Sequence, residues 1–331
     1  MSKRPIRQIH PVAQRVYTYG AQHPPLTTVK SGETVEIHCV DSADNCIQHS
    51  SDLPSEKLKY PYLNPQTGPV IVEGAEPGDS LAVKIHKITP TTEWAWSALI
   101  PHFGALTETP QTAMLHDPLP EKVWIYPLKG GQVHLRNGIK IPFQPFAGTM
   151  GTAPQIESIS SLAPGNHGGN MDCADICPGN TVLFPVRAEG AHFMVGDLHA
   201  AQGDGELCGV ACEMAGAITL TFHVLKKQPI NWPRVISDDF IMSIGSARPL
   251  EDAVRIATQD VVMWMEADFG FDRWEAFQLL SQVCQLRIAN MVDTTYSVVA
   301  TFPRRYLPKN SKGMKTLRIA SRLGMAKQPH S

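Results

Sequence analysis

The segment Pro178-Gly179-Asn180-Thr181-Val182-Leu183-Phe184-Pro185-Val186 joins a tight turn to a run of strand-forming residues. Proline presets φ for such a turn, and glycine supplies its permissive corner. The same order of glycine turn, polar residue, hydroxyl and strand recurs at Ser31-Gly32-Glu33-Thr34-Val35 and at Pro77-Gly78-Asp79-Ser80-Leu81. Three such turns, in a chain with 27 Pro and 25 Gly, favour a β-sandwich or barrel.

The pattern on either side of this segment divides the chain. β-Branched alternation predicts strands at residues 12–19, 34–40, 70–72, 80–88 and 218–224. From Pro249 apolar residues recur at helical spacing as far as Met265, Gly270 ends that helix, and Asp272 opens a second helix that runs to Val283. Residues 297–302 form a last predicted strand.

These patterns predict a mainly β protein, a jelly-roll-like sandwich or barrel with α-helices in the C-terminal region, α+β overall. Residues 1–248 form the β-rich part that carries the site, with a candidate division into two subdomains near residue 150. Residues 249–306 form the helical pair and the final strand packed on it. Residues 307–331 form a basic C-terminal extension, because eight Lys and Arg and no acidic residue follow Asp293. That extension is either solvated or docked on a neighbouring subunit.

Composition excludes several classes of protein. A net charge of -2 argues against nucleic-acid binding. No run approaches the ~18 apolar residues of a membrane span, and the N-terminus lacks an apolar signal core, so we expect a cytoplasmic protein. The seven cysteines include no Cys-x-x-Cys pair, which favours free buried thiols over disulfides.

Two polar blocks flank the opening segment. They read Gly-Asn-His-Gly-Gly-Asn-Met-Asp (165–172) and Gly-Asp-Leu-His-Ala-Ala-Gln-Gly-Asp-Gly-Glu (196–206). Each block surrounds a histidine and carboxylates with glycines. Residues 181–186 and 191–195 between them read as a short hairpin, so we expect the blocks to meet and to form one site.

The residue types in the blocks are those of a hydrolytic metal site. Asp197 and His199 lie two apart on a strand and therefore point to one face. His167 and Asp172 lie in a glycine-rich loop that can turn both inward. Two histidines and two carboxylates suit Zn²⁺, which lowers the pKa of a bound water toward ~7.

Such chemistry also needs a carboxylate that carries a proton to the leaving group. Glu73, Glu206 and Glu213 are the candidates for that role. Asp41, before a long polar loop, is a candidate extra ligand. His102, Gly169 and Asn170 are candidate substrate-binding residues, because they lie in glycine-containing turns that can approach a ligand closely.

Structural interpretations stand beside these. A histidine next to a turn is more often a hydrogen-bonding residue than a ligand, although two such blocks bring the metal interpretation level with it. Glu73 can equally be a solvated strand residue. Asp204 and Glu206 can equally bind a structural Ca²⁺, although they lack the spacing of an EF-hand. The chain has no dinucleotide-binding fingerprint, no Walker-type loop and no Gly-x-Ser-x-Gly elbow.

The two blocks, together with Asn64-Pro65-Gln66-Thr67-Gly68-Pro69 and Val72-Glu73-Gly74-Ala75-Glu76-Pro77-Gly78-Asp79, resemble the signature blocks of the acetamidase/formamidase family. The resemblance covers about residues 12–306. It implies a β-rich jelly-roll-like fold and hydrolysis of small aliphatic amides to carboxylate and ammonia. It also implies Zn²⁺ as the metal and a homodimer or larger homo-oligomer. His102, Gln285 and the basic extension depart from the family's pattern.

The leading hypothesis is therefore an amidohydrolase of the formamide and acetamide class. In it His167, Asp172, Asp197, His199 and Asp41 bind Zn²⁺, with Ca²⁺ as a candidate second ion, and Glu73 or Glu206 protonates the departing ammonia. A second hypothesis is a hydrolase of another C–N bond, in a ureido or guanidino compound. A third is a Ca²⁺-stabilised β-sandwich that binds a small ligand or carbohydrate, against which the two histidines argue.

Overall fold

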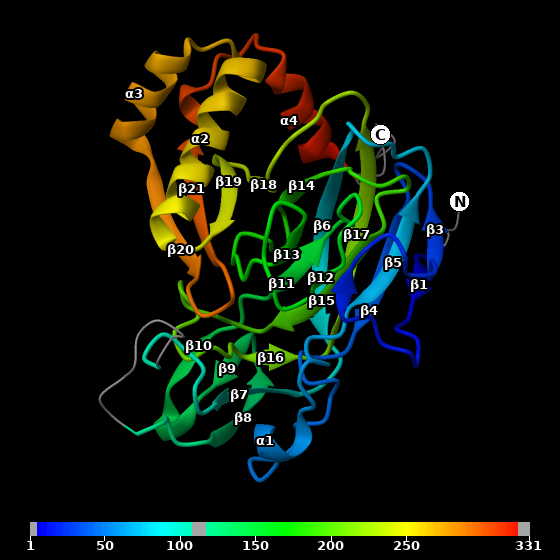
Figure 1. Cartoon of the computed structure of the whole chain (residues 1–331), viewed down its shortest axis with the longest axis vertical. Coiled ribbons are helices and arrows are strands. Elements are labelled where there is room, and N and C mark those ends of the chain that lie inside the picture. The colour runs from blue at the N-terminus through cyan, green and yellow to red at the C-terminus, as the bar shows by residue number, and fades with distance from the viewer. Residues whose placement is uncertain (1–4, 108–116, 324–331) are drawn as a thin grey trace.

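Two large β-sheets form the body of the protein (Figure 1). The computed structural model describes residues 5–107 and 117–323. The first sheet has nine strands, in the order β1 (Arg7–Ile9), β4 (Thr34–Cys39), β17 (Gly216–Leu225), β6 (Ser80–Pro90), β14 (Thr181–Pro185), β18 (Arg234–Ile236), β19 (Phe240–Ala247), β21 (Tyr296–Pro303) and β20 (Gln285–Asn290). Its neighbouring strands run antiparallel except for β1 and β4, the one parallel pair of this sheet in the part of the chain that the structure describes.

The second sheet has ten strands and carries both polar blocks. Its main path runs β10 (Lys140–Pro142), β9 (Gln132–His134), β8 (Lys122–Lys129), β7 (Trp94–Leu99), β16 (Glu213–Met214), β15 (Phe193–His199), β11 (Phe146–Gly151) and β13 (Gly168–Asn170). β5 (Thr67–Val72) also pairs with β15, and β3 (Thr27–Val29) pairs with β5. β2 (Thr18–Tyr19) and β12 (Ile159–Ser160) form a separate small sheet. The sheets do not close into a barrel, so the sandwich rather than the barrel describes this fold.

The main hydrophobic core lies between the two sheets. Phe193 of the second sheet packs edge-on against Phe222 of the first, with ring centroids 5.0 Å apart, and lies 6.3 Å from Phe184. All three rings are fully buried. Such aromatic pairs contribute about 0.5–1.5 kcal/mol beyond the burial of their area. The strands that end in the polar blocks are therefore anchored by rigid packing.

The three repeated turns behave alike. Gly32, Gly78 and Gly179 have φ values of 90°, 93° and 98°, and a Cβ at each would point into open space. The strands that follow, β4, β6 and β14, all belong to the nine-stranded sheet. The turn motif therefore marks one sheet of the sandwich.

The predicted hairpin between the two polar blocks is wrong. β14 pairs with β6 and β18 in the first sheet, whereas β15 pairs with β11, β16 and β5 in the second. The link turns through Gly190, Ala191 and His192, which all have positive φ. Because the chain reverses through this left-handed turn, it crosses from one sheet to the other. The predicted strand at 12–19 is likewise reduced to β2 and a bridge at Val16.

The C-terminal helices pack on the part of the first sheet that β19 and β21 form, as Figure 1 shows. α2 (Leu250–Phe269) ends at Gly270, whose φ is 73°, and α3 (Arg273–Val283) begins after Asp272, whose side chain accepts from the N–H groups of Trp274 and Glu275. These helix boundaries match the sequence prediction. α1 (Pro54–Lys57) and two 3-10 turns, η1 (Arg136–Gly138) and η2 (Arg304–Tyr306), complete the helices apart from α4.

A buried ion pair joins α2 to the sheet beneath it. Arg234 donates to both oxygens of Asp260 at 2.7 and 3.0 Å, Ser243 donates to the same carboxylate, and the guanidinium lies over Trp264. Charges this deeply buried require such pairing, because loss of one partner leaves the other unsatisfied. β20 and β21, after these helices, extend the same sheet.

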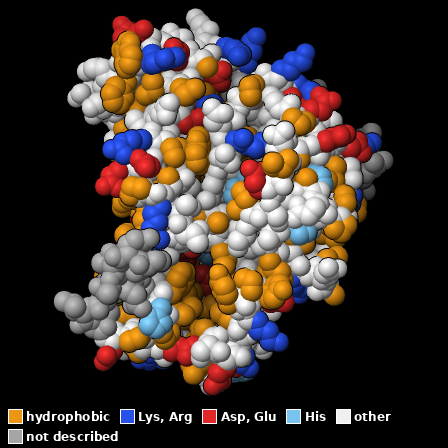
Figure 2. Space-filling view, viewed as in Figure 1, with side chains coloured by type: hydrophobic (Ala, Val, Ile, Leu, Met, Phe, Trp, Pro, Cys, Tyr) orange, Lys and Arg blue, Asp and Glu red, His pale blue; other side chains and the backbone are white. Residues whose placement is uncertain are grey.

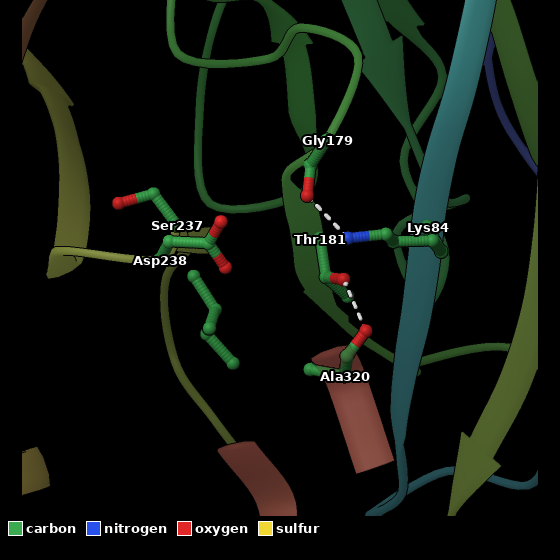
Figure 3. A pocket seen from close by; sticks show the side chains of 7 residues that line it. Lys84, Gly179, Thr181, Ser237, Asp238 and Ala320 are labelled. Atoms are coloured by element: carbon green, nitrogen blue, oxygen red, sulfur yellow. Dashed lines mark hydrogen bonds between the residues drawn. The ribbon is translucent and has the colours of Figure 1, made fainter. Parts of the chain in front are cut away.

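The described part of the basic extension is ordered as α4 (Gly313–Arg322), which packs by Leu317 and Ala320. The hydroxyl of Thr181 donates to the carbonyl of Ala320 at 3.0 Å, beside a shallow recess where the Lys84 ammonium donates to the carbonyl of Gly179 (Figure 3). Residues 324–331 of the predicted extension lie outside the described residues. None of the described helices has the length and hydrophobicity needed to cross a membrane.

Candidate active site

The two polar blocks meet through β11, which lies between them. β11 pairs with β13 on one side, at Met150 and Gly169, and with β15 on the other, at Phe146 and His199. Figure 1 shows these strands at the centre of the molecule. The two blocks therefore meet in space as expected, although a strand from elsewhere in the chain joins them.

A buried cluster of one histidine and four carboxylates lies at this junction. The ligand atoms of Asp172, Asp197 and His199 all lie within 4.8 Å of one another, and those of His199, Glu206 and Glu213 form a second such group. His199 Nε2 lies 3.2 Å from Asp197 Oδ1 and 3.4 Å from Glu213 Oε1. Asp197 and His199 therefore converge as predicted, although Asp197 has a left-handed φ of 57° and the pair does not follow the regular period of a strand.

Three of these carboxylate residues have a left-handed backbone. Asp172, Asp197 and Glu206 have φ values of 47°, 57° and 50°. A non-glycine residue in this region costs about 1–3 kcal/mol, and such residues concentrate at functional sites. The packed sheets around the cluster therefore hold these side chains in directions that the local sequence would not choose.

Gly148 on β11 leaves the space in which the cluster sits. A Cβ at this position would lie 2.6 Å from Asp172 Oδ1, 2.8 Å from His199 Cε1 and 2.9 Å from Asp197 Oδ2. Asp172 Oδ1 is buried and has no hydrogen-bond partner. A buried carboxylate oxygen without a donor is costly unless a cation or a proton satisfies it.

The orientation of His199 follows from its neighbour Gln202. The Gln202 amide nitrogen donates to the carbonyls of Asp172 and Ala289, so its oxygen faces His199 Nδ1 at 2.9 Å and accepts the Nδ1 proton. Nε2 is then the nitrogen that faces the carboxylates. This is the tautomer that a metal-binding histidine needs, with a second group fixing the ring.

Two hydrogen bonds fix the side chain of Asp197. Its Oδ2 accepts from Asn64 Nδ2 at 3.1 Å and from Thr149 Oγ1 at 2.9 Å. Asn64 is itself oriented by Gln66, whose amide nitrogen donates to Asn64 Oδ1 at 2.7 Å. Asp197 Oδ1 is consequently the oxygen turned toward His199.

The C-terminal strand region adds residues that the sequence analysis did not identify. Asn290, at the end of β20, donates to Asp172 Oδ2 and, at 2.6 Å, to Asp293 Oδ2. Asn170 also donates to Asp293 Oδ2, at 2.7 Å. No local motif marks Asn290 and Asp293, because about 90 residues separate them from the second block. The family resemblance, which covers about residues 12–306, includes them but does not single them out.

Burial and mutual repulsion control the ionisation of the cluster. Burial and the charge of Asp197 raise the pKa of Asp172 to about 7. Burial, and then Asp172, raise the pKa of Glu206 well above its usual range, and burial also raises the pKa of Glu213. Burial opposes ionisation of Asp197 and His199, but their mutual attraction lowers the pKa of Asp197 and, with Glu213, raises the pKa of His199 well above 6.5.

His167 does not join this cluster. Its ring is fully buried against Tyr19, with centroids 5.1 Å apart, and neither ring nitrogen has a hydrogen-bond partner. Burial lowers the pKa of His167 to about 4. A Cβ on Gly169 would lie 2.8 Å from His167 Nε2, so Gly169 makes room for this ring. His167 is therefore absent from both groups of potential ligands.

Asp41 is buried beside the cluster, but its carboxylate accepts hydrogen bonds from the backbone of the loop that follows it. Its Oδ1 accepts from the N–H groups of Ala43 and Asn45, and its Oδ2 accepts from the indole of Trp96 at 3.1 Å. Burial raises the pKa of Asp41 to about 7. Its neighbour Ser42 donates to Glu213 Oε2 at 2.7 Å, so this loop supports Glu213.

The structure does not bring Glu73 to the cluster. It is exposed and follows β5, at the opposite end of that strand from Thr67, which pairs beside the second block. His102 is also exposed, and its turn packs on residues 207–209 through the bond from Ala105 N–H to the Leu207 carbonyl. Asn170 lies in the cluster, where its oxygen accepts from Asn64 Nδ2 at 3.2 Å.

A hollow opens over this region. Figure 2 shows it near the middle of the molecular face, with acidic side chains at its floor and hydrophobic side chains along its lower rim. Glu206 is 7% exposed and Asp293 is half-buried, whereas Asp172 and His199 are each 1% exposed. Asp293 is therefore the most accessible of these acidic residues, and the cluster beneath it is buried.

The chain is similar to known proteins over most of its length. The model of the Acetamidase/Formamidase family matches residues 7–163 and 156–307. The solved structure of an acetamidase from Yersinia enterocolitica is 44% identical, with a TM-score of 0.89, over 93% of this chain and 94% of that chain.

Curated relatives are more distant. A formamidase of Methylophilus methylotrophus is 24% identical over 66% of this chain and 67% of its own length. An acetamidase of Mycolicibacterium smegmatis is 26% identical over 61% of this chain and 64% of its own length. The chain thus spans about two thirds of the length of these curated relatives.

Proposed function

Because the chain belongs to the Acetamidase/Formamidase family, we propose that it hydrolyses small linear amides, of the formamide and acetamide class, to a carboxylate and ammonia. The observation that carries this proposal is His199. Gln202 holds its Nδ1 proton, and its Nε2 faces carboxylates in a buried, glycine-lined space. That arrangement suits a hydrolytic centre. The stability of the fold does not require so many buried ionisable side chains in one place.

We infer that a divalent cation, Zn²⁺, belongs to this site. Asp172, Asp197 and His199 would hold it, with Glu213 or Glu206 next to them. The fit rests on the unpartnered Asp172 Oδ1, on the tautomer of His199 and on the space kept by Gly148. The donors combine nitrogen with oxygen, which suits Zn²⁺ better than Ca²⁺. When bound, Zn²⁺ lowers the pKa of a coordinated water and polarises a carbonyl oxygen.

The protein's own residues then have separate tasks. Asn64 and Thr149 fix Asp197, and Gln202 fixes His199, so the floor is rigid before substrate arrives. In hydrolysis, water supplies a hydroxyl group to the amide carbon and a proton to the amide nitrogen, which leaves as ammonia, and the carboxylic acid formed then loses its proton to give the carboxylate. Glu206 is the residue that we assign to this proton transfer, because its raised pKa keeps a proton available at neutral pH.

The test measures ammonia release from formamide and acetamide by the purified protein. We expect turnover, bound zinc in the untreated protein, loss of both with a chelator and recovery on addition of Zn²⁺. Asp252→Asn on the exposed start of α2 serves as a control that leaves all of these unchanged. Metal-loaded protein that releases no ammonia from either amide would contradict the substrate assignment. Bound calcium without zinc would contradict the metal assignment.

A further inference from the structure

A series of buried hydrogen bonds runs from the small sheet to the carboxylate of Asp197. Tyr19 lies on β2, and Asn64 and Gln66 lie in the segment just before β5. The Tyr19 hydroxyl is 3.0 Å from Gln66 Oε1, and Gln66 Nε2 is 2.7 Å from Asn64 Oδ1. Asn64 Nδ2 is in turn 3.1 Å from Asp197 Oδ2. Tyr19 is fully buried, and Asn64 and Gln66 are each 3% exposed, so water competes little for these groups.

The direction of each hydrogen bond follows from groups that can only accept. Gln66 Nε2 lies 3.1 Å from the backbone carbonyl of Asn64, so this end of the Gln66 amide is the nitrogen. Gln66 Oε1 then faces the Tyr19 hydroxyl and accepts its proton. At the other end a carboxylate oxygen of Asp197 accepts, so Asn64 turns its nitrogen toward Asp197 and its oxygen toward Gln66. Every donor in the series therefore points toward Asp197.

The second polar block is shaped to admit this series. A Cβ on Gly196 would lie 2.8 Å from Gln66 Nε2 and 2.7 Å from the carbonyl of Pro65. The residue before Asp197 is therefore a glycine at the place where the Gln66 amide packs. Asn64 has a left-handed φ of 56°, and its N–H donates to the carbonyl of Ser42 at 2.8 Å. Its side chain is thus held from the backbone as well as through its amide oxygen.

We propose that Tyr19 and Gln66 are positioning residues for the cation site. Through Asn64 they keep Asp197 Oδ2 occupied, so that Oδ1 faces His199 Nε2. This inference rests on the zinc site proposed above and assigns to it residues that do not touch the ion.

The loss of either residue acts on Asp197 through the amide of Asn64. Without the donor of Gln66, that amide is free to turn over and bring its oxygen to Asp197 Oδ2. Two acceptors in contact repel, and Asp197 then lacks a buried hydrogen bond. Second partners of metal ligands typically change metal affinity by about 10- to 100-fold.

A double-mutant cycle on zinc affinity tests the proposal. We expect Gln66→Met to lower the affinity about 10- to 100-fold and Tyr19→Phe to lower it about fivefold. In protein that carries both changes, the affinity should equal that of Gln66→Met within twofold, because Tyr19 acts only through Gln66. The Tyr19 hydroxyl keeps an acceptor in Gln66→Met, since it also lies 3.3 Å from the carbonyl of Met194. Competition with a chromophoric chelator measures all four affinities.

Ser243→Ala is the matched control for Tyr19→Phe. It also removes one fully buried hydroxyl, which donates to Asp260 at 2.8 Å beneath α2. We expect both variants to lose stability in urea, and zinc affinity to fall only in Tyr19→Phe. This pair decides the proposal if Gln66→Met does not fold.

Each other outcome contradicts the proposal. Unchanged zinc affinity in Tyr19→Phe, or an equal fall in Ser243→Ala, means that Tyr19 has only a structural role. Effects of Tyr19→Phe and Gln66→Met that multiply in the double variant mean that the two residues act independently. Wild-type protein that binds no zinc overturns the proposal together with the metal assignment. Failure of amide hydrolysis is a separate result, because zinc-loaded protein then releases no ammonia while the cycle still reports on Tyr19 and Gln66.

Discussion

The two polar blocks look alike as sequences and differ in chemistry as structures. Each places a fully buried histidine among glycines, with an aspartate nearby. His199 faces Asp197 and Glu213, and its pKa is raised well above 6.5. His167 packs on Tyr19 with both nitrogens unpartnered, and its pKa falls to about 4. His199 has Asp197 and Gln202 from its own block and Glu213 from another strand, whereas His167 has no such partner, so the two histidines differ in whether they can be charged or bind a cation.

The comparison also separates two uses of glycine. Gly148 leaves space among the groups of the acidic cluster, whereas Gly165 and Gly169 leave space around the ring of His167. The first space faces the unpartnered Asp172 Oδ1, and the second holds a ring that contacts Tyr19 and has two unpartnered nitrogens. Glycine therefore marks close packing in both blocks and does not distinguish a reactive site from a structural one.

The largest expected effect comes from replacing the two histidines in turn. His199→Ala removes the one nitrogen that faces the carboxylates, and we expect amide turnover to fall by about 10³-fold or more, with loss of bound zinc. His167→Phe keeps a ring against Tyr19, and we expect activity and zinc content to stay within about fivefold of wild type.

Ammonia release and metal analysis, with circular dichroism to verify folding, measure both variants. If folded His167→Phe loses its zinc while His199→Ala keeps it, the assignment of the two blocks is reversed.

The second effect concerns stability and pH. The pKa of His167 falls from 6.5 to about 4 on folding, so the unfolded chain binds more protons between these values. Its contribution to stability is therefore complete above pH 6.5 and is lost as the pH falls toward 4. The loss is about 2–3 kcal/mol at pH 4.5.

Urea unfolding of wild type and His167→Phe at pH 7.5 and 4.5 measures this difference. We expect the variant to lose less stability on acidification, by that amount, since it has no imidazole to protonate. Parallel losses in the two proteins would show that His167 is not buried in its neutral form.

A smaller effect is expected at Gln202, which has no counterpart at His167. Gln202→Leu removes the acceptor of the His199 Nδ1 proton, and we expect zinc affinity to fall by about 10- to 100-fold. Gln202→Glu retains an oxygen acceptor and serves as the matched control. Competition with a chromophoric chelator gives both affinities. Equal affinity in wild type and Gln202→Leu would mean that the ring is oriented by other contacts.

The smallest effect is expected at Glu73, the candidate proton carrier that the structure leaves at the surface. Glu73→Gln should change kcat by less than about twofold, whereas Glu206→Gln should lower it by about 10²-fold, because only Glu206 lies in the cluster. Steady-state kinetics with acetamide decides between them. A large loss in the Glu73 variant and none in the Glu206 variant would restore the interpretation based on sequence alone.

Much of the fold was predictable because it depends on local preferences. The glycine turns before β4, β6 and β14, the alternation in β17 and the boundaries of α2 and α3 all follow from interactions within a few residues. The hairpin failed for the same reason. Two adjacent strands usually pair, and nothing in residues 186–192 reveals that the chain crosses to the other sheet.

The site was predictable only in part. The contact of Asp197 with His199 was predicted because the two residues lie two apart in the chain, although the left-handed backbone of Asp197 was not foreseen. Asn64, Asn290 and Asp293 reach the cluster from distant segments, and no spacing rule connects them to it. Glu73 fails to reach it because β5 runs away from the cluster toward solvent.

By itself, the sequence determined a β-rich chain with C-terminal helices and two glycine-laced blocks that bear histidine and carboxylate. Backbone preference and side-chain period act over a few residues, so a short segment specifies its own strand, turn or helix whatever the rest of the chain does. Only the tertiary fold set His199 beside Glu213, Glu206 and Asp172, and enclosed His167 against Tyr19 with both ring nitrogens unpartnered. Burial and charge act through space, and residues far apart in the chain set them.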